Sequence, residues 1–145
     1  MKKVMITIIF LLVSLRLIAP VDDREIILYS GPQYIYNVKD PFLRSVIRYE
    51  SNFNERAVNP YSKARGVLQI LPVMICEVNK YSDVKYTWND AWDPVKSIEI
   101  WWIVMDKRNP EYHYDKACRI WFGTGIQKHD GMTWEDYYNE VMLNL

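Results

Sequence analysis

The sequence predicts a mainly α-helical domain. Three positions along the 145 residues carry a marked helix start, and few stretches between them alternate apolar and polar residues as half-buried strands do. Half of the residues are hydrophobic and a quarter are charged, a balance typical of globular chains and not of disordered or fibrous ones. The length corresponds to one domain of ordinary size.

The expected helices begin at residues that can cap a first turn. These caps are Asp40 before Pro41, Asp93 before Pro94, and Thr133 with Asp136, a capping-box arrangement with Asp in place of the usual Glu or Gln. One further helix is bounded by the glycines that follow Trp121. The helices are therefore predicted over residues 41–53, 94–107, 115–121 and 136–143.

The stretch 94–107 is apolar on nearly every side, which predicts a helix at the centre of the domain. Its length, together with Glu99 and Asp106, excludes a membrane span. Residues 54–66 lack a regular period and contain Asn59-Pro60, so we expect a loop or small hairpin there. Loops of this kind often carry functional residues.

The first residues resemble a secretory signal. Lys2 and Lys3 precede twelve residues without a charge, which as a helix would rise only about 18 Å against a hydrocarbon core of roughly 30 Å. We therefore interpret residues 1–19 as a signal peptide, with an uncleaved anchor as the alternative because Arg16 and Pro20 surround a poor cleavage site. Residues 20–39 are then an N-terminal extension or linker, and residues 40–145 are the working domain. The expected location is the periplasm or cell envelope, with any membrane association made through the N-terminal segment.

The charge balance restricts the partners. Eighteen basic and eighteen acidic residues cancel, so the chain lacks the positive charge on which nucleic-acid binders depend, and no nucleic-acid partner is expected. Removal of residues 1–19 leaves fifteen basic residues against the same eighteen acids, a charge of −3. This charge also disfavours a secreted antibacterial protein that relies on attraction to anionic cell walls.

Cysteine and histidine are too few for a metal centre. His113 and His129 are the only histidines, and no C-x₂-C or H-E-x-x-H spacing occurs, so neither a metal nor another cofactor is expected. Cys76 and Cys118 are the only cysteines, and each lies in an apolar helical stretch. They could form one disulfide in an exported chain or remain reduced in the core, and the sequence leaves both alternatives open.

Glu50 stands out on the first predicted helix. At about 100° per residue, it shares one face with apolar side chains, while charged and polar residues such as Arg44 and Arg48 lie opposite. A carboxyl group that faces a core loses hydration, which raises its pKa and suits it to act as a general acid. The alternatives are that Glu50 bends out to water at the helix end or pairs with an arginine in a structural bridge.

The residues that follow Glu50 carry a family resemblance. Glu50-Ser51-x-Phe53-Asn54 is followed by Ala57-Val58-Asn59-Pro60 and, sixteen residues after Glu50, by Gly66-Val67-Leu68-Gln69-Ile70-Leu71-Pro72. This pattern resembles the lysozyme-like lytic transglycosylase (SLT) family, in which a Glu-Ser pair ending a helix precedes Gly-Leu-Met-Gln-Ile/Leu-Met-Pro. The resemblance covers roughly residues 40–140. It is weaker at the third family motif, Ala-Tyr-Asn-Gly, where this chain has Ile120-Trp121-Phe122-Gly123.

The resemblance implies a lysozyme-like fold in which a small loop or hairpin region lies beside an active-site groove. It implies cleavage of the β-1,4 bond between N-acetylmuramic acid and N-acetylglucosamine in peptidoglycan glycan strands. Glu50 would act as the single catalytic acid and then as the base, giving 1,6-anhydromuramyl products, with the substrate's N-acetyl group in place of a second carboxylate. The alternatives are a hydrolytic muramidase on the same fold and a catalytically weakened glycan-binding or structural module.

The resemblance also implies further site residues. Ser51, Gln69, Trp121 and Tyr137 are similar to substrate-binding residues of the family. Taken alone, Ser51 could instead bond back to its own helix, Gln69 could be a solvated polar residue, and Trp121 could anchor the core. Gly66 is expected to permit a positive φ or a close backbone approach. Phe122 departs from the family because it cannot replace an amide, so Thr124 or a backbone group takes over that role, or turnover is altered or lost.

Overall fold

The computed structural model describes residues 26–27, 37–123 and 131–145. The predicted signal peptide, most of the predicted linker at 20–39, and Thr124 lie outside the described residues. Within the described part, no helix has both the length and the apolar character that crossing a membrane requires.

The described elements are mainly helical, which confirms the predicted fold class. Two short strands, β1 (Ile26–Ile27) and β2 (Asn37–Val38), pair antiparallel, with Ile26 opposite Val38. One 3₁₀ helix, η1 (Trp88–Trp92), lies between the second and third α-helices. The α-helices are α1 (Pro41–Ser51), α2 (Pro72–Tyr81), α3 (Pro94–Arg108), α4 (Tyr114–Phe122) and α5 (Trp134–Leu143).

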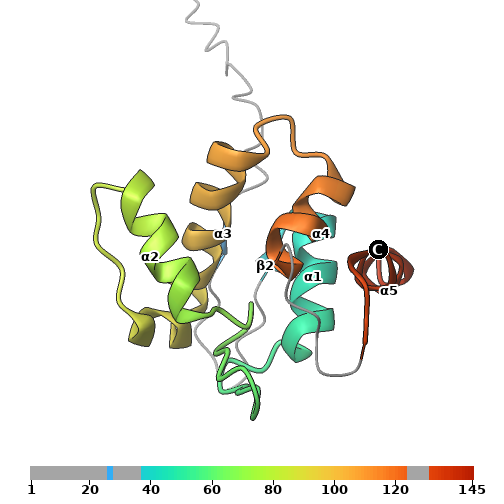
Figure 1. Ribbon diagram of the computed structural model, residues 1–145, viewed down its shortest axis with the longest axis horizontal. Helices are drawn as coiled ribbons and strands as arrows, with labels where there is room; N and C mark the ends of the chain where they lie inside the picture. The colour runs from blue at the N-terminus through green and yellow to red at the C-terminus, as the bar shows by residue number, and fades with distance from the viewer. Residues whose placement is uncertain (1–25, 28–36, 124–130) are drawn as a thin grey trace, which may run out of the picture.

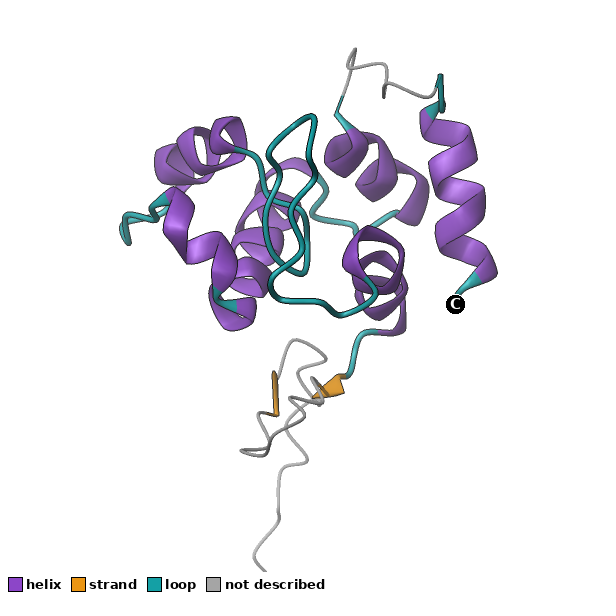
Figure 2. Cartoon of the chain, turned by 90° about the horizontal axis from the view of Figure 1, so that it is seen from below, coloured by secondary structure: helices purple, strands orange, loops and turns teal. Residues whose placement is uncertain are grey.

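The helices pack in two groups (Figure 1). Helix α2 packs against α3, and η1 packs against the same helix, while α5 packs against both α1 and α4. The long loop between α1 and α2 crosses the molecule between these groups (Figures 1 and 2). Isolated bridges pair Arg65 with Val58 and with Ile70, so this loop has the hairpin character predicted for residues 54–66.

The three predicted caps are formed. The Asp40 carboxylate accepts from the Leu43 N–H at 2.5 Å, and that of Asp93 accepts from the Val95 N–H at 2.9 Å. Thr133 and Asp136 form both hydrogen bonds of a capping box. Each cap satisfies N–H groups that the first helical turn leaves without a partner.

The end of α1 corrects one predicted boundary. We expected the helix to run to residue 53, but it ends at Ser51, and Asn52 and Phe53 take positive φ values of 50° and 63°. The N–H of Asn52 still bonds the Arg48 carbonyl oxygen at 2.9 Å, so Asn52 closes the helix as a left-handed cap. Glu50 therefore lies in the last turn of α1.

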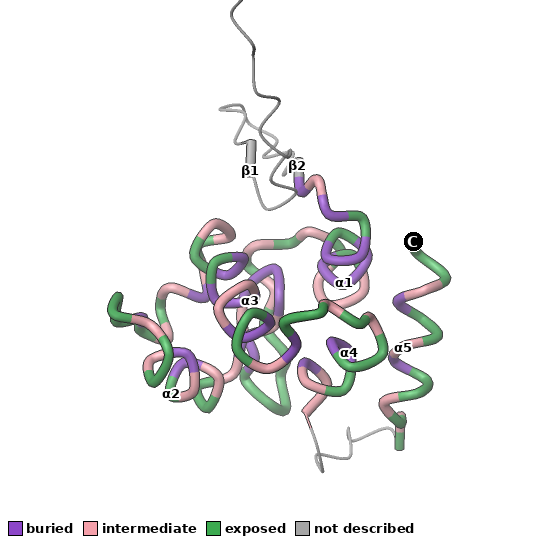
Figure 3. The backbone as a smooth tube through the Cα atoms, turned by 90° about the horizontal axis from the view of Figure 1, so that it is seen from above, coloured by how far each residue is buried: buried purple, intermediate pink, exposed green. Residues whose placement is uncertain are grey.

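The core is formed around α3 and the inner faces of α1 and α4. Six residues of α3 are buried, including Trp101, and Trp102 and Ile103 are half-buried against the same core. This agrees with the central place predicted for this helix, and Figure 3 shows the buried segments of α1 and α3 in the interior and α5 at the edge. Cys76 is exposed on α2, Cys118 is buried on α4, and the two are not joined.

Candidate active site

Glu50 is hydrogen-bonded to a tyrosine that lies far from it in the sequence. The Tyr137 hydroxyl, on α5, donates a hydrogen bond of 2.7 Å to Oε1 of the half-buried Glu50. Packing of α5 on α1 makes this contact, and the Ser45 hydroxyl strengthens that packing by donating to the Val141 carbonyl oxygen. The expected carboxyl group is therefore held at the junction of two helices.

Two aromatic rings enclose the Tyr137 ring, which has 0 % exposure. The Tyr49 ring meets it edge-on with centroids 4.9 Å apart, and the Phe122 ring lies 5.5 Å away at an interplanar angle of 48°. The Tyr49 hydroxyl in turn donates to Sδ of Met132 at 3.0 Å. Three helices thus contribute aromatic side chains beside Glu50.

The electrostatics keep the Tyr137 phenol protonated. Burial raises the pKa of Tyr137 well above its usual value of 10, and the Glu50 carboxylate adds to the increase because it repels a phenolate. Tyr137 therefore remains a hydrogen-bond donor at any pH near neutrality.

Cys118 is also neutral in this environment. Burial raises the pKa of its thiol to about 12, and the negative charges of Glu50 and then Asp115 contribute. Because the thiolate is the reactive form, a buried thiol with this pKa is not a nucleophile near neutral pH.

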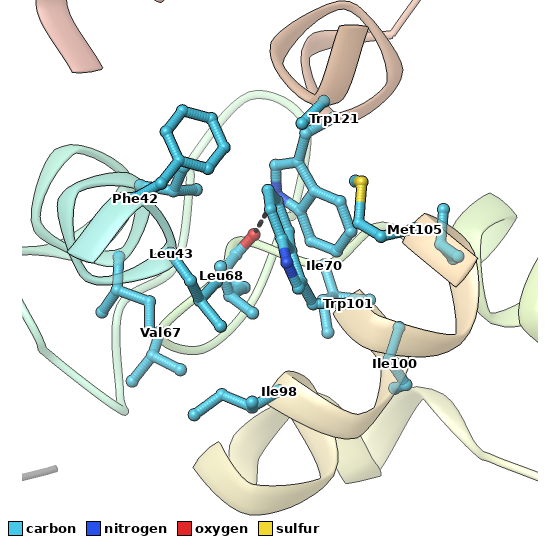
Figure 4. Close-up of a cluster of buried hydrophobic side chains, with 14 of the residues drawn as sticks. Phe42, Leu43, Val67, Leu68, Ile70, Ile98, Ile100, Trp101, Met105 and Trp121 are labelled. Atoms are coloured by element: carbon cyan, nitrogen blue, oxygen red, sulfur yellow. Dashed lines mark hydrogen bonds between the residues drawn. The ribbon is translucent and has the colours of Figure 1, made fainter. Parts of the chain in front are cut away.

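The segment 66–70 is held by side chains from both sides. The Ser51 hydroxyl donates to the Val67 carbonyl oxygen at 2.9 Å, and Nε1 of Trp121 donates to the Leu68 carbonyl oxygen at 3.0 Å (Figure 4). The Gln69 amide donates to the carbonyl oxygens of Gly66 (3.0 Å) and Ala57 (3.2 Å). The Glu-Ser motif and the glycine motif are therefore connected directly.

Gly66 meets both requirements expected of it. Its φ is +75°, and a Cβ placed there would lie 1.8 Å from the Ala91 carbonyl oxygen. That oxygen also accepts a hydrogen bond from the Ser97 hydroxyl at 3.1 Å. Only glycine allows the loop to lie this close to η1.

The predicted site residues fall into two sets. Glu50 and Tyr137 are in contact, while Ser51, Gln69 and Trp121 bind backbone carbonyl oxygens of the segments around residues 57 and 66–68. Trp121 is 7 % exposed, and its ring packs on that of Trp101 with centroids 4.6 Å apart, which favours the core-anchor alternative. Ser51 also forms the back-bond considered as its alternative, to the Ile47 carbonyl oxygen at 3.3 Å. The burial of Tyr137 and Trp121 leaves these rings little or no surface to offer a sugar.

Sequence reasoning did not identify two of the aromatic residues in this arrangement. Tyr49 precedes Glu50 directly but carried no motif, and Phe122 was noted only as a departure from the family. Their common partner, Tyr137, lies far along the sequence from Tyr49, so no local spacing indicates either contact.

Comparison with family models matches residues 28–120 to the transglycosylase SLT domain. Comparisons with curated proteins and with solved structures gave no match.

Proposed function

The chain belongs to the transglycosylase SLT domain family, and from this membership we propose that it is a murein lytic transglycosylase. Members of the family bind the glycan strands of peptidoglycan and act at the cell wall. The proposed reaction breaks the β-1,4 bond between N-acetylmuramic acid and N-acetylglucosamine. The proposed enzyme class is thus a carbohydrate-active lyase.

Glu50 is proposed as the acid of the first step. Because the Tyr137 hydroxyl donates to Oε1, a protonated Glu50 carries its proton on Oε2. That proton passes to the glycosidic oxygen as the C1–O4 bond breaks, which frees the hydroxyl of N-acetylglucosamine. The acetamido oxygen of the muramyl sugar stabilises the electron-poor C1, so that no second carboxylate is needed.

The same residue is proposed as the base of the second step. Ionised Glu50 takes the proton of the muramyl C6 hydroxyl, and O6 forms the new bond to C1. The products are a 1,6-anhydromuramyl end and a Glu50 that again holds a proton. The Tyr137 hydroxyl stabilises the carboxylate between the two steps, because hydrogen bonds to charged groups are stronger than those between neutral groups.

The observation that supports this proposal most directly is the hydrogen bond between Glu50 and the fully buried Tyr137. It provides a half-buried carboxyl group in a fixed orientation, which is what general acid catalysis requires. Ser51 and Gln69 are proposed to hold segment 66–70 in place beside it, and Trp121 is proposed to anchor the same segment through the Leu68 carbonyl oxygen.

The test is digestion of purified peptidoglycan followed by mass spectrometry. Wild-type protein is expected to release 1,6-anhydromuramyl fragments, and Glu50→Gln is expected to release none. The control is Glu140→Gln, which makes the same change at an exposed position on α5 and should act like wild type. Absence of such fragments from wild-type digests would contradict the proposal.

Two alternatives give different results in the same experiment. A hydrolytic muramidase would release fragments with reducing ends, because water would replace the C6 hydroxyl as acceptor. A weakened glycan-binding module is favoured by one observation, that a phenylalanine packs on Tyr137 at the position where the motif resemblance implies an amide. Such a module would bind insoluble peptidoglycan and release no soluble fragments.

Export is proposed from the sequence of residues 1–19. The mature chain would then begin near residue 20, in the periplasm or cell envelope. Mass spectrometry of the chain recovered from the envelope distinguishes a cleaved signal from a retained anchor.

A further inference from the structure

Phe122 occupies a defined position next to the Glu50–Tyr137 pair. It is the last residue of α4, and the following Gly123 ends the helix with a φ of 88° and an N–H bond to the Arg119 carbonyl oxygen at 3.2 Å. Its half-buried ring lies 5.5 Å from the Tyr137 ring. The helix end thus fixes the backbone from which this ring reaches α5.

We propose that Phe122 is a positioning residue that acts through Tyr137: its ring holds the Tyr137 ring in the orientation that brings the hydroxyl to Glu50. This inference rests on the proposed function, because it assigns a role in the reaction to a residue that does not touch the reacting atoms.

The geometry of a tyrosine side chain supports this role. The position of the hydroxyl is fixed by the orientation of the ring, since the oxygen lies on the ring axis. Tyr49 restrains this ring edge-on at 89°, and Phe122 restrains it at 48° from another helix. Contacts from α1 and α4 together define the ring position, as tilted and edge-on aromatic pairs are favourable arrangements.

Burial adds to the effect of Phe122. An apolar ring packed on Tyr137 helps to keep water from competing for the Tyr137 hydroxyl. A hydrogen bond to a charged group is stronger where water is excluded. Titratable groups near this pair include Tyr49 on α1, whose ring packs on Tyr137, and Cys118 on α4, whose thiol is neutral because burial raises its pKa.

The test is a double-mutant cycle in the full chain with Phe122→Ala, Tyr137→Phe and the combined variant. We expect Phe122→Ala to lower kcat/KM about tenfold, because small displacements of positioned groups reduce rates strongly. In a Tyr137→Phe background the same change should cause no further loss, since residues that act as a unit have non-additive effects. Equal losses in both backgrounds would overturn the proposal.

The pH profile of kcat/KM provides a second readout. Loss of the Tyr137 hydrogen bond disfavours the ionised form of Glu50. The limb of the kcat/KM profile that is set by ionisation of Glu50 should therefore move to higher pH. Phe122→Ala should move this limb in the same direction, and Phe122→Leu, which keeps an apolar cover, should restore the wild-type profile. An unchanged limb in Phe122→Ala would contradict a positioning role.

A third readout does not depend on activity. The buried Tyr137 hydroxyl proton should give a slowly exchanging, downfield NMR resonance that Tyr137→Phe removes and so assigns. We expect this resonance to weaken or shift in Phe122→Ala and to persist in Ile103→Ala, which truncates a half-buried side chain on α3. If wild type does not cleave peptidoglycan, the proposed function fails, while this resonance still tests the contact.

One further variant separates positioning from substrate binding. Phe122→Asn introduces the amide side chain that the family motif Ala-Tyr-Asn-Gly implies at this position. A positioning role predicts a loss similar to that of Phe122→Ala. A gain in kcat/KM would instead show that the position serves the substrate, and would overturn the inference.

Discussion

The Tyr137 hydroxyl lies 2.7 Å from Oε1 of Glu50, although the two residues are 87 positions apart in the sequence. Glu50 belongs to α1 and Tyr137 to α5, the first and the last of the described α-helices. The hydrogen bond joins a half-buried carboxyl group to a phenol that burial keeps protonated. This pair defines the candidate active site, and the first prediction concerns it.

Tyr137→Phe should lower kcat/KM on peptidoglycan by roughly ten- to a hundredfold, because a hydrogen bond to a charged group contributes about 1.5–3 kcal/mol. KM should change little, since the fully buried Tyr137 has no surface for substrate. Steady-state kinetics of released fragments measures both parameters. Tyr138→Phe, which makes the same change at the half-buried neighbour, is the control, and an equal loss there would argue against the pair.

Gly66→Ala should destabilise the fold by more than about 3 kcal/mol, because the new Cβ collides with the Ala91 backbone in addition to the strain of a positive φ. Gly131→Ala is a matched control, as Gly131 has nearly the same φ of +76° and no atom of the described residues lies within 4 Å of the added Cβ. It should cost only about 1–2 kcal/mol. Urea unfolding of both variants measures the difference, and similar losses would show that crowding at η1 is unimportant.

Asp90 should support stability at neutral pH and lose this effect in acid. Its hydrogen bond with Lys96, then that from the Thr87 N–H at 2.6 Å, lower its pKa from 3.8 to about 2. The ionised form therefore stabilises the fold above pH 3.8, and the contribution disappears as the pH falls towards 2.

Asp90→Asn should accordingly reduce the thermal midpoint at pH 7, and the gap to wild type should narrow between pH 4 and 2. Thermal unfolding followed by circular dichroism across this range checks the prediction. Asp83→Asn, at an exposed position before η1, serves as control. A gap that stays constant down to pH 2 would contradict the assigned role of Asp90.

Trp121→Phe should cost about 1–3 kcal/mol, because the Leu68 carbonyl oxygen would lose its hydrogen bond from the indole in a buried environment. It should also lower activity, since segment 66–70 loses its connection to α4. Trp88→Phe is the comparison, as Nε1 of Trp88 has no hydrogen-bond partner among the described residues. Chemical unfolding and the peptidoglycan digest together test whether the loss is specific to Trp121.

The fold could be predicted from the sequence where its determinants are local. The caps at Asp40, Asp93 and Thr133 lie within three residues of the groups they bind, so their spacing is visible in the chain. The family resemblance read from the motifs after Glu50 is confirmed by the family match over residues 28–120.

Three features of the structure were not predicted from the sequence, each for a physical reason. Helix α2 received no predicted bounds because its cap position is Leu71, whose side chain makes no capping hydrogen bond, although Pro72 follows it. The end of α1 was misplaced because Asn52 leaves the helix without interrupting the apolar periodicity. The capping box between Thr87 and Asp90 is a local signal that could have revealed η1.

The site itself could be predicted only in part. Glu50 is apparent because it interrupts an apolar face, but its bond to Tyr137 arises from the packing of α1 against α5. Trp121 likewise reaches Leu68 through tertiary packing, so its choice between sugar contact and core anchor could not follow from spacing.

Because Tyr137 lies on α5, the proposed activity depends on how early α5 detaches during unfolding. A partly open state that releases α5 while the centre around Trp101 stays intact would separate phenol from carboxyl group without melting the domain. Heating or mild denaturant should therefore abolish turnover before the global transition, because elements at the edge of a fold detach at lower free energy than its interior.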